Sequence, residues 1–260
     1  MNQKLAKKLA DKKYRIETGL FLVEGEKNII ELLHSDFVVE TVFGTNQFFE
    51  QVHEILYTQE KSGVSGMGQH PQLISVSEEA LTQMGTLMSN NAGIAVARMR
   101  SDPFEINQIT TAARKGIILA LDDIRDPGNL GTIMRIADWY DVKHVIASTE
   151  TTDVYNPKTI AASMGSFTRV EVNYLALALL LPQLRAEDIP IIGAFMEGRS
   201  IHEGVLPRHG VLLLGSESHG IREDLASYVT ERVTIPRYGK AESLNVSVAA
   251  GIILDTLRLG

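Results

Sequence analysis

The stretch GIILALDDIRDPGNLGTIMRIADWY, residues 116–140, decides the fold of the longer half of this chain. It opens with a continuous apolar run, which is typical of a strand buried on both faces of a parallel sheet. Asp126, Pro127 and Gly128 predict a tight turn, and Asn129 is placed to cap the helix after it. Apolar residues then recur at helical spacing, at Leu130, Ile133, Met134 and Ala137. A strand, a turn and an amphipathic helix in this order predict an α/β unit.

Five more strand candidates follow this stretch, in KHVIAS, TRVEVN, IPIIGAF, GVLLLGS and ERVTIP, with helical segments between several of them. Six strands with interleaved helices predict a mostly parallel sheet with helices on both faces. Ligands of such sheets bind beyond the carboxyl ends of the strands. The polar residues that directly follow each strand are therefore the candidate site.

The residues before this unit predict a second, smaller domain. Strand-like and helical patterns alternate over residues 1–100, which predicts an α/β fold, and the Gly-rich residues 61–71 predict a surface loop within it. Residues 101–115, SDPFEINQITTAARK, have the character of a linker. The expected organisation is thus a domain over 1–100, a linker over 101–115 and a second domain over 116–260.

The composition excludes several classes of protein. The 260 residues are 44% hydrophobic and 22% charged, a balance typical of globular proteins. Cysteine is absent, which rules out disulfides, thiolate metal sites and cysteine nucleophiles, and the histidines are too scattered to predict a metal site. No apolar stretch has membrane-spanning length, and the N-terminus lacks the apolar run of a signal peptide. We therefore expect a soluble cytoplasmic protein without a membrane partner.

Charge is unevenly distributed along the chain. The formal net charge is −7, yet the first 15 residues carry six basic side chains and a single acidic one. A basic segment on an acidic protein suits a local contact with phosphates, although a solvated lysine-rich helix has the same composition. If the segment binds RNA, the contacting residues are expected to be Lys7, Lys8, Lys12, Lys13 and Arg15.

Two further clusters follow predicted strands. In LLLGSESHGI, residues 212–221, Gly215 ends a strand where backbone can approach a ligand closely, and Glu217 places a carboxylate beside it. In IPRYGKAESLNVSVAAGIILDTL, residues 235–257, a polar loop leads to a helix that either Ser243 or Asn245 can cap. This helix is apolar almost all round, which indicates burial against the sheet on one side and against a partner subunit on the other.

Familiar catalytic and nucleotide-binding motifs are missing from these clusters. No G-x-G-x-x-G follows a strand, the GKAES segment lacks the spacing of a phosphate-binding P-loop, and no H-E-x-x-H is present. The G-x-S-x-G motif of α/β-hydrolases is also missing.

The three clusters, in this order and spacing, resemble the SpoU/TrmH family of RNA ribose methyltransferases. The matching segments are DPGNLGTIMR, LLLGSESHGI and IPRYGKAESLNVSVA, with YNPKTIAASMGS between the first two. The segment RIETGLFLVEGEKNIIELL is similar to the family's optional N-terminal RNA-binding domain, which has a ribosomal-protein-like fold. The resemblance implies a deep trefoil knot in residues 116–260, a homodimer, and transfer of a methyl group from S-adenosylmethionine, with no metal, to a ribose 2′-hydroxyl.

The resemblance also assigns roles to individual residues. It implies a methyl-donor pocket formed around Gly215, Ile235 and Leu244, with Ser243 and Asn245 beside them. The residues implied in catalysis are Arg135, Asn129, Glu217, Ser243 and Asn245.

A guanidinium is a reluctant base, because its pKa lies above 12. We therefore expect Arg135 to hold a phosphate and to stabilise developing alkoxide charge, and Glu217 to orient the third cluster. The separate N-terminal domain favours ribosomal RNA as the substrate. A transfer RNA methyltransferase and a non-catalytic RNA-binding ribosome-assembly factor are the alternatives.

Overall fold

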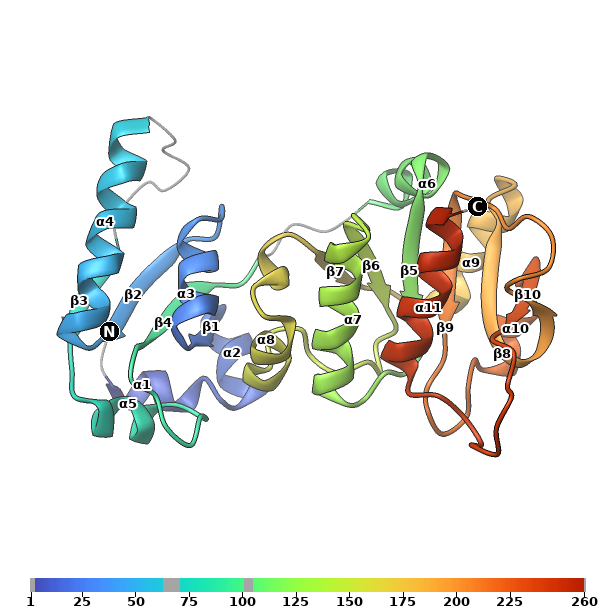
Figure 1. Cartoon of the computed structure of the whole chain (residues 1–260). Helices are drawn as coiled ribbons and strands as arrows, with labels where there is room; N and C mark the ends of the chain where they lie inside the picture. Colours follow the sequence, from blue (N-terminus) through green and yellow to red (C-terminus); the bar gives the residue numbers. More distant parts are fainter. Residues whose placement is uncertain (1–2, 63–70, 101–104, 260) are drawn as a thin grey trace. The chain divides into compact units, whose positions relative to one another are not determined.

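A computed structural model describes residues 3–62, 71–100 and 105–259, and it divides into two compact units (Figure 1). The first unit comprises residues 1–101 together with 153–169, and the second comprises residues 102–152 and 170–260. The second unit is therefore built from two separate stretches of chain, and residues 153–169 belong to the first.

The first unit is built on a four-stranded sheet of order β1-β4-β2-β3. Its strands are β1 (Leu20–Glu24), β2 (Val39–Gly44), β3 (Gln72–Ser75) and β4 (Gly93–Arg98). Strand β4 is antiparallel to both neighbours, whereas β2 and β3 are parallel. The helices are α1 (Gln3–Lys8), α2 (Lys12–Thr18), α3 (Glu26–Leu33), α4 (Asn46–Ser62), α5 (Glu78–Met84) and α8 (Pro157–Ser163), and a 3-10 turn, η1, spans Ser166–Thr168. The strands and helices of residues 1–100 follow the predicted α/β pattern, and α8 and η1 come from residues 153–169.

The segment 153–169 is tied to the first unit by aromatic and ionic contacts. Phe21 of β1 packs against the rings of Tyr155 and Phe167, with ring centroids 4.6 and 6.2 Å away. Arg15 is 2% exposed, and its Nη2 lies 2.6 Å from Asp153 Oδ2. Because Phe21, Phe167 and Arg15 are buried in these contacts, the segment contributes to the core of this unit.

The second unit contains a six-stranded sheet of order β10-β8-β9-β5-β6-β7, in which every pair is parallel. Its strands are β5 (Ile117–Leu121), β6 (His144–Ala147), β7 (Glu171–Tyr174), β8 (Ile191–Ser200), β9 (Gly210–Leu214) and β10 (Glu231–Thr234). Its helices are α6 (Ile106–Lys115), α7 (Pro127–Trp139), α9 (Leu177–Ala186), α10 (Glu223–Ala226) and α11 (Val246–Leu259). All six predicted strands are confirmed, as is the parallel sheet.

Helices cover this sheet on both sides. One face packs against α6, α9 and α10 through a cluster that includes Ile118, Leu213 and Leu181. Successive strand residues alternate between faces, so Leu119 and Leu212, which are fully buried, point to the other side. There α7 and α11 pack against each other, and Figure 1 shows both helices in front of the sheet.

One predicted connection differs from what is observed. Residues 106–115 of the predicted linker form α6, which packs into the core through Ile109 and Ala113, while 101–104 lie outside the described residues. Residues 63–70 of the predicted loop also lie outside them.

Within the described part of the chain, no helix is both long and apolar enough to cross a membrane.

Candidate functional site

The first two predicted clusters begin side by side because β5 and β9 are neighbours in register. Leu121, the last residue of β5, pairs with Leu214, the last residue of β9. The pairing continues for one more residue, since the amide of Asp122 donates to the carbonyl of Leu214 at 2.9 Å. The two loops therefore leave the carboxyl edge of the sheet at the same level.

The first loop turns into α7 with a cap different from the predicted one. Asp126 is the N-cap, and its Oδ1 accepts a hydrogen bond from the amide of Asn129 at 2.9 Å. Pro127 occupies the first helical position, where the missing N–H costs nothing. The prediction that Asn129 caps this helix is wrong, because the carboxylate of Asp126 already fills that role. As a result, the Asn129 side chain is available to bond to another loop.

The second loop forms a closed turn after β9. Ser216 and Gly220 exchange backbone hydrogen bonds of 3.0 and 2.9 Å across it. A Cβ atom on Gly215 would lie 2.0 Å from the carbonyl carbon of Gly220, so any side chain at this position would disrupt the turn. The turn presents Glu217 and Ser218 at its exposed tip.

The third loop returns from the edge strand β10 to the start of α11, and Asn245 is the residue that ends it. The Asn245 Oδ1 accepts from the amide of Ser247 at 2.9 Å, so Asn245 caps α11. The prediction left the cap open between two residues, and the structure selects Asn245 over Ser243.

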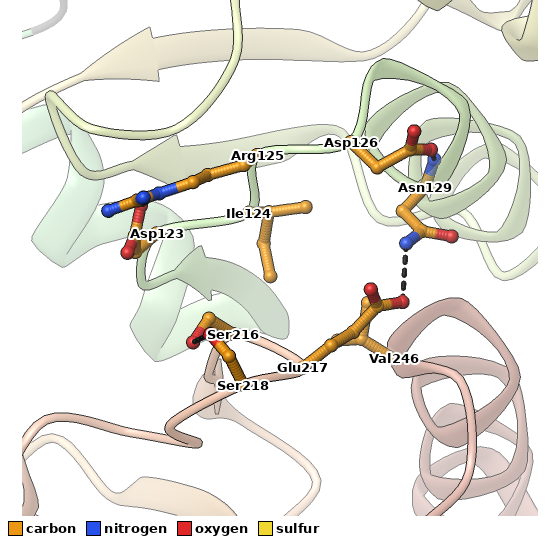
Figure 2. Close-up of a pocket in the computed structure, with 9 residues that line it drawn as sticks. All are labelled: Asp123, Ile124, Arg125, Asp126, Asn129, Ser216, Glu217, Ser218 and Val246. Carbon is orange, nitrogen blue, oxygen red and sulfur yellow. Dashed lines mark hydrogen bonds and ion pairs between the residues drawn. The ribbon is translucent and has the colours of Figure 1, made fainter.

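The three loops meet at a cluster of three side chains. Glu217 Oε1 accepts hydrogen bonds from Asn129 Nδ2 at 2.6 Å and from Asn245 Nδ2 at 2.9 Å. Asn245 Nδ2 also lies 2.9 Å from Asn129 Oδ1. Figure 2 shows the first of these bonds between α7 and the second loop. One carboxylate thus ties together residues separated by more than a hundred positions in the sequence.

Other predicted site residues do not join this cluster. Arg135 is exposed on α7, and no hydrogen bond or ion pair to it is found among the described residues. It follows Asn129 by six residues, an advance of about 240° around a helix, so it faces a different direction. Ser243 is exposed on the third loop, Leu244 is 48% exposed and Ile235 is half-buried.

Sequence reasoning missed an ion pair that joins the first two loops. Asp122 is fully buried and accepts from the backbone amide of Arg222 at 2.9 Å and from its Nε at 2.8 Å. Burial raises the pKa of the Asp122 carboxyl, and the hydrogen bonds and charge of Arg222 oppose this shift. An aspartate at the end of an otherwise apolar run was the available signal, because a buried carboxylate needs a partner.

The basic N-terminal residues form two short helices and separate into two groups. Lys7, Lys8, Lys12 and Lys13 are exposed and remain candidates for phosphate contacts. Arg15 is buried, and in addition to its ion pair it donates to the carbonyls of residues 9 and 10 at 2.8 Å. The prediction that Arg15 contacts RNA is wrong, because its guanidinium already has partners inside the first unit.

An all-parallel sheet with polar loops converging at its carboxyl edge defines the second unit as an α/β ligand-binding domain of the enzyme type. The sequence of this unit identifies the protein family to which the chain belongs. Residues 116–255 match the SpoU rRNA Methylase family, and the chain belongs to this family. Residues 3–94 match the MRM3-like substrate binding domain.

The chain is similar to known proteins over nearly its whole length. The chain is 32% identical over 260 residues to the 23S rRNA (guanosine(2553)-2′-O)-methyltransferase RlmP of Bacillus subtilis, covering 99% of this chain and 96% of that protein. The AdoMet-bound structure of an rRNA methyltransferase from Sinorhizobium meliloti superimposes with a TM-score of 0.79 at 26% identity, covering 99% of this chain and 94% of that one. The SpoU methyltransferase AviRb from Streptomyces viridochromogenes shares the fold, with a TM-score of 0.81 at 22% identity over 99% of this chain and 97% of that one.

Proposed function

We propose that this chain is a cytoplasmic enzyme that transfers a methyl group from S-adenosylmethionine to a ribose 2′-hydroxyl of ribosomal RNA. The observation that carries the proposal is the cluster of Asn129, Glu217 and Asn245 at the carboxyl edge of the sheet. Its family membership and its likeness to a 23S rRNA 2′-O-methyltransferase over the whole chain support the same reaction.

The second and third loops fit the methyl donor chemically. Ile235 and Leu244 offer apolar surface suited to a purine ring, and the turn after Gly215 and the loop up to Ser243 offer backbone polar groups. Asn245 stands at the junction between this surface and the polar cluster. When bound, the donor supplies an activated methyl group on a sulfonium. The protein's main task is then to align the acceptor hydroxyl with it.

The residues of the chain divide this task. Glu217 holds Asn129 and Asn245 in a fixed arrangement, and we assign it this orienting role in preference to acid–base work. Arg135 is assigned to the RNA, where its planar guanidinium suits a phosphate oxygen pair and stabilises alkoxide charge as the hydroxyl proton leaves to phosphate or water.

A homodimer and a knotted chain path are part of the proposal. Trp139 is 84% exposed and follows Arg135 by one helical turn, so both lie on the same face of α7. Val248 on the neighbouring α11 is 48% exposed. A second copy covering these helices would bury this apolar surface and bring Arg135 to the subunit boundary. The return of residues 235–245 from the edge strand β10 to α11 is compatible with a trefoil knot.

The first unit is assigned to RNA binding. Its match to a substrate-binding domain supports this role, and so do the exposed Lys7, Lys8, Lys12 and Lys13. A separate module suits a structured RNA that must be held beyond the modified nucleotide.

The test is methyl incorporation from radiolabelled S-adenosylmethionine into unmodified ribosomal RNA and transfer RNA. We expect alkali-resistant label in ribosomal RNA, and we expect Arg135→Ala to lower the rate by roughly 10² or more, the usual effect of removing one transition-state donor. Arg185→Ala is the matched control, because Arg185 is also an exposed helical arginine, on α9. It should leave the rate unchanged.

The other results separate the alternatives. Label confined to transfer RNA would show that transfer RNA is the substrate, and the proposed reaction would stand. Donor binding without transfer to either RNA would reject free RNA as the substrate. Absence of donor binding, measured by calorimetry, would reject catalysis and leave a ribosome-assembly factor.

A further inference from the structure

A pocket lies between the first two loops, with the polar cluster at one end. Its lining residues are Asp123, Ile124, Arg125, Asp126, Asn129, Ser216, Glu217, Ser218 and Val246. Figure 2 shows Asn129 and Glu217 at one end of this pocket and Asp123 with Arg125 at the other. Arg125 belongs to none of the roles assigned above.

The charge of this pocket is unfavourable for RNA except at Arg125. Three carboxylates line it, on Asp123, Asp126 and Glu217, and Arg125 is the single cation among the lining residues. A phosphodiester carries a negative charge, so it would be repelled along the rest of the wall and attracted to this guanidinium.

The backbone holds Arg125 in place at a conformational cost. Asp123 has a φ of 59°, a left-handed conformation that is uncommon for residues other than glycine. Its amide donates to Ser148 Oγ at 3.0 Å, and its carboxylate accepts from Arg125 Nε at 2.7 Å. These two contacts fix the turn from which the Arg125 side chain projects.

The ion pair leaves the guanidinium available to a ligand. Arg125 is 77% exposed at its side chain, and exposed ion pairs contribute little to stability. Asp123 binds Nε, so the terminal nitrogens of Arg125 keep N–H donors that can form a bidentate contact with a phosphate.

We propose that Arg125 binds a backbone phosphate of the RNA next to the ribose presented to Asn129, with Asp123 as the residue that positions its side chain. This inference rests on the proposed function for the identity of the ligand. Arg125 thereby places the nucleotide in the pocket, a role separate from the stabilisation of charge assigned to Arg135.

The experiment uses the full chain and measures the dissociation constant for unmodified 23S ribosomal RNA as a function of salt, and the KM and kcat of methyl transfer. The variants are Arg125→Ala and Arg125→Lys. The matched control is Arg114→Ala, which removes another exposed arginine in an ion pair, with Glu187 at 2.9 Å, away from the pocket. Donor affinity, measured by calorimetry, should be the same in all four proteins.

We expect Arg125→Ala to weaken RNA binding at least about tenfold, the loss typical of a hydrogen bond to a charged group. The slope of log Kd against log salt should fall by about 1, since one phosphate contact is lost. The effect on methyl transfer should appear mainly in KM. Arg125→Lys should bind RNA more tightly than Arg125→Ala but less tightly than the parent. Lysine keeps the positive charge but lacks the planar guanidinium that makes a bidentate contact.

Arg125→Ala behaving like Arg114→Ala in affinity and in salt slope would overturn the inference. Failure of the parent protein to bind RNA would overturn it together with the proposed function. If the parent binds RNA but transfers no methyl group, a selective loss in Arg125→Ala would still support the phosphate contact while the proposed reaction fails.

Discussion

The buried carboxylate of Asp122 provides a sharp test of what holds the site together. It follows β5 directly, has no solvent exposure, and receives both of its hydrogen bonds from Arg222. Burial raises the pKa of this carboxyl, and Arg222 counteracts the shift. Arg222 is therefore the group that opposes the effect of burial on the pKa of Asp122 and links the first loop to the second.

Arg222→Ala removes the Nε donor and its charge but keeps the backbone amide that donates at 2.9 Å. Losing one hydrogen bond to a charged group costs about 1.5–3 kcal/mol, and breaking a buried pair completely costs about 3–5 kcal/mol. The Arg222 side chain is 42% exposed and one of the two bonds remains. We therefore expect the free energy of unfolding to fall by about 2–3 kcal/mol at pH 7.

The loss should depend on pH in a defined direction. Without Arg222, the pKa of Asp122 rises further, so the native state binds a proton that the unfolded chain has already released. Where the native state binds more protons, stability increases as the pH falls. The difference in the free energy of unfolding between the parent and Arg222→Ala should therefore become smaller as the pH is lowered from 7 to 5.

The assay is urea unfolding followed by circular dichroism at the two pH values, with hydrogen exchange of peptides from β5 and β9 to locate the loss. Arg114→Ala is the control, since its ion pair is exposed and should contribute about 0–1 kcal/mol at either pH. Equal losses in the two variants, or an Arg222→Ala deficit that is unchanged at pH 5, would refute the assignment of Arg222 as the partner that counteracts the burial of Asp122.

Two further predictions concern packing. Gly215→Ala would place a Cβ atom 2.0 Å from the backbone of Gly220, so we expect the turn to open and donor affinity to fall at least about tenfold by calorimetry. Gly116→Ala is the control, because it has no atom within 4 Å of its Cβ and lies outside the three loops, so it should bind the donor as the parent does. Equal affinity in both variants would contradict this. Arg15→Ala should lower the stability of the first unit by about 3 kcal/mol or more, because Asp153 loses its buried partner. Urea unfolding measures it, and a loss below 1 kcal/mol would mean that the ion pair is dispensable.

The sequence alone determined the strands and the faces of the helices. Apolar periodicity is a local property, so it placed all six strands of the parallel sheet, and it identified Leu130, Ile133, Met134 and Ala137 as the buried stripe of α7. The rule that ligands bind at the carboxyl ends of parallel strands then selected the loops of Asn129, Glu217 and Asn245. Lys7, Lys8, Lys12 and Lys13 are exposed, which is compatible with both interpretations of the N-terminal segment, a phosphate contact and a solvated helix.

Only the tertiary structure decided which of these groups meet. Strand order brings β5 beside β9, and the chain returns from β10 to α11, so one carboxylate can accept from two amides more than a hundred residues apart. The same long-range packing buries Arg15 against Asp153 and Asp122 against Arg222, although nothing near them in the sequence reveals a partner. Contacts of this kind depend on the relative placement of distant elements, and a local pattern carries no information about that placement.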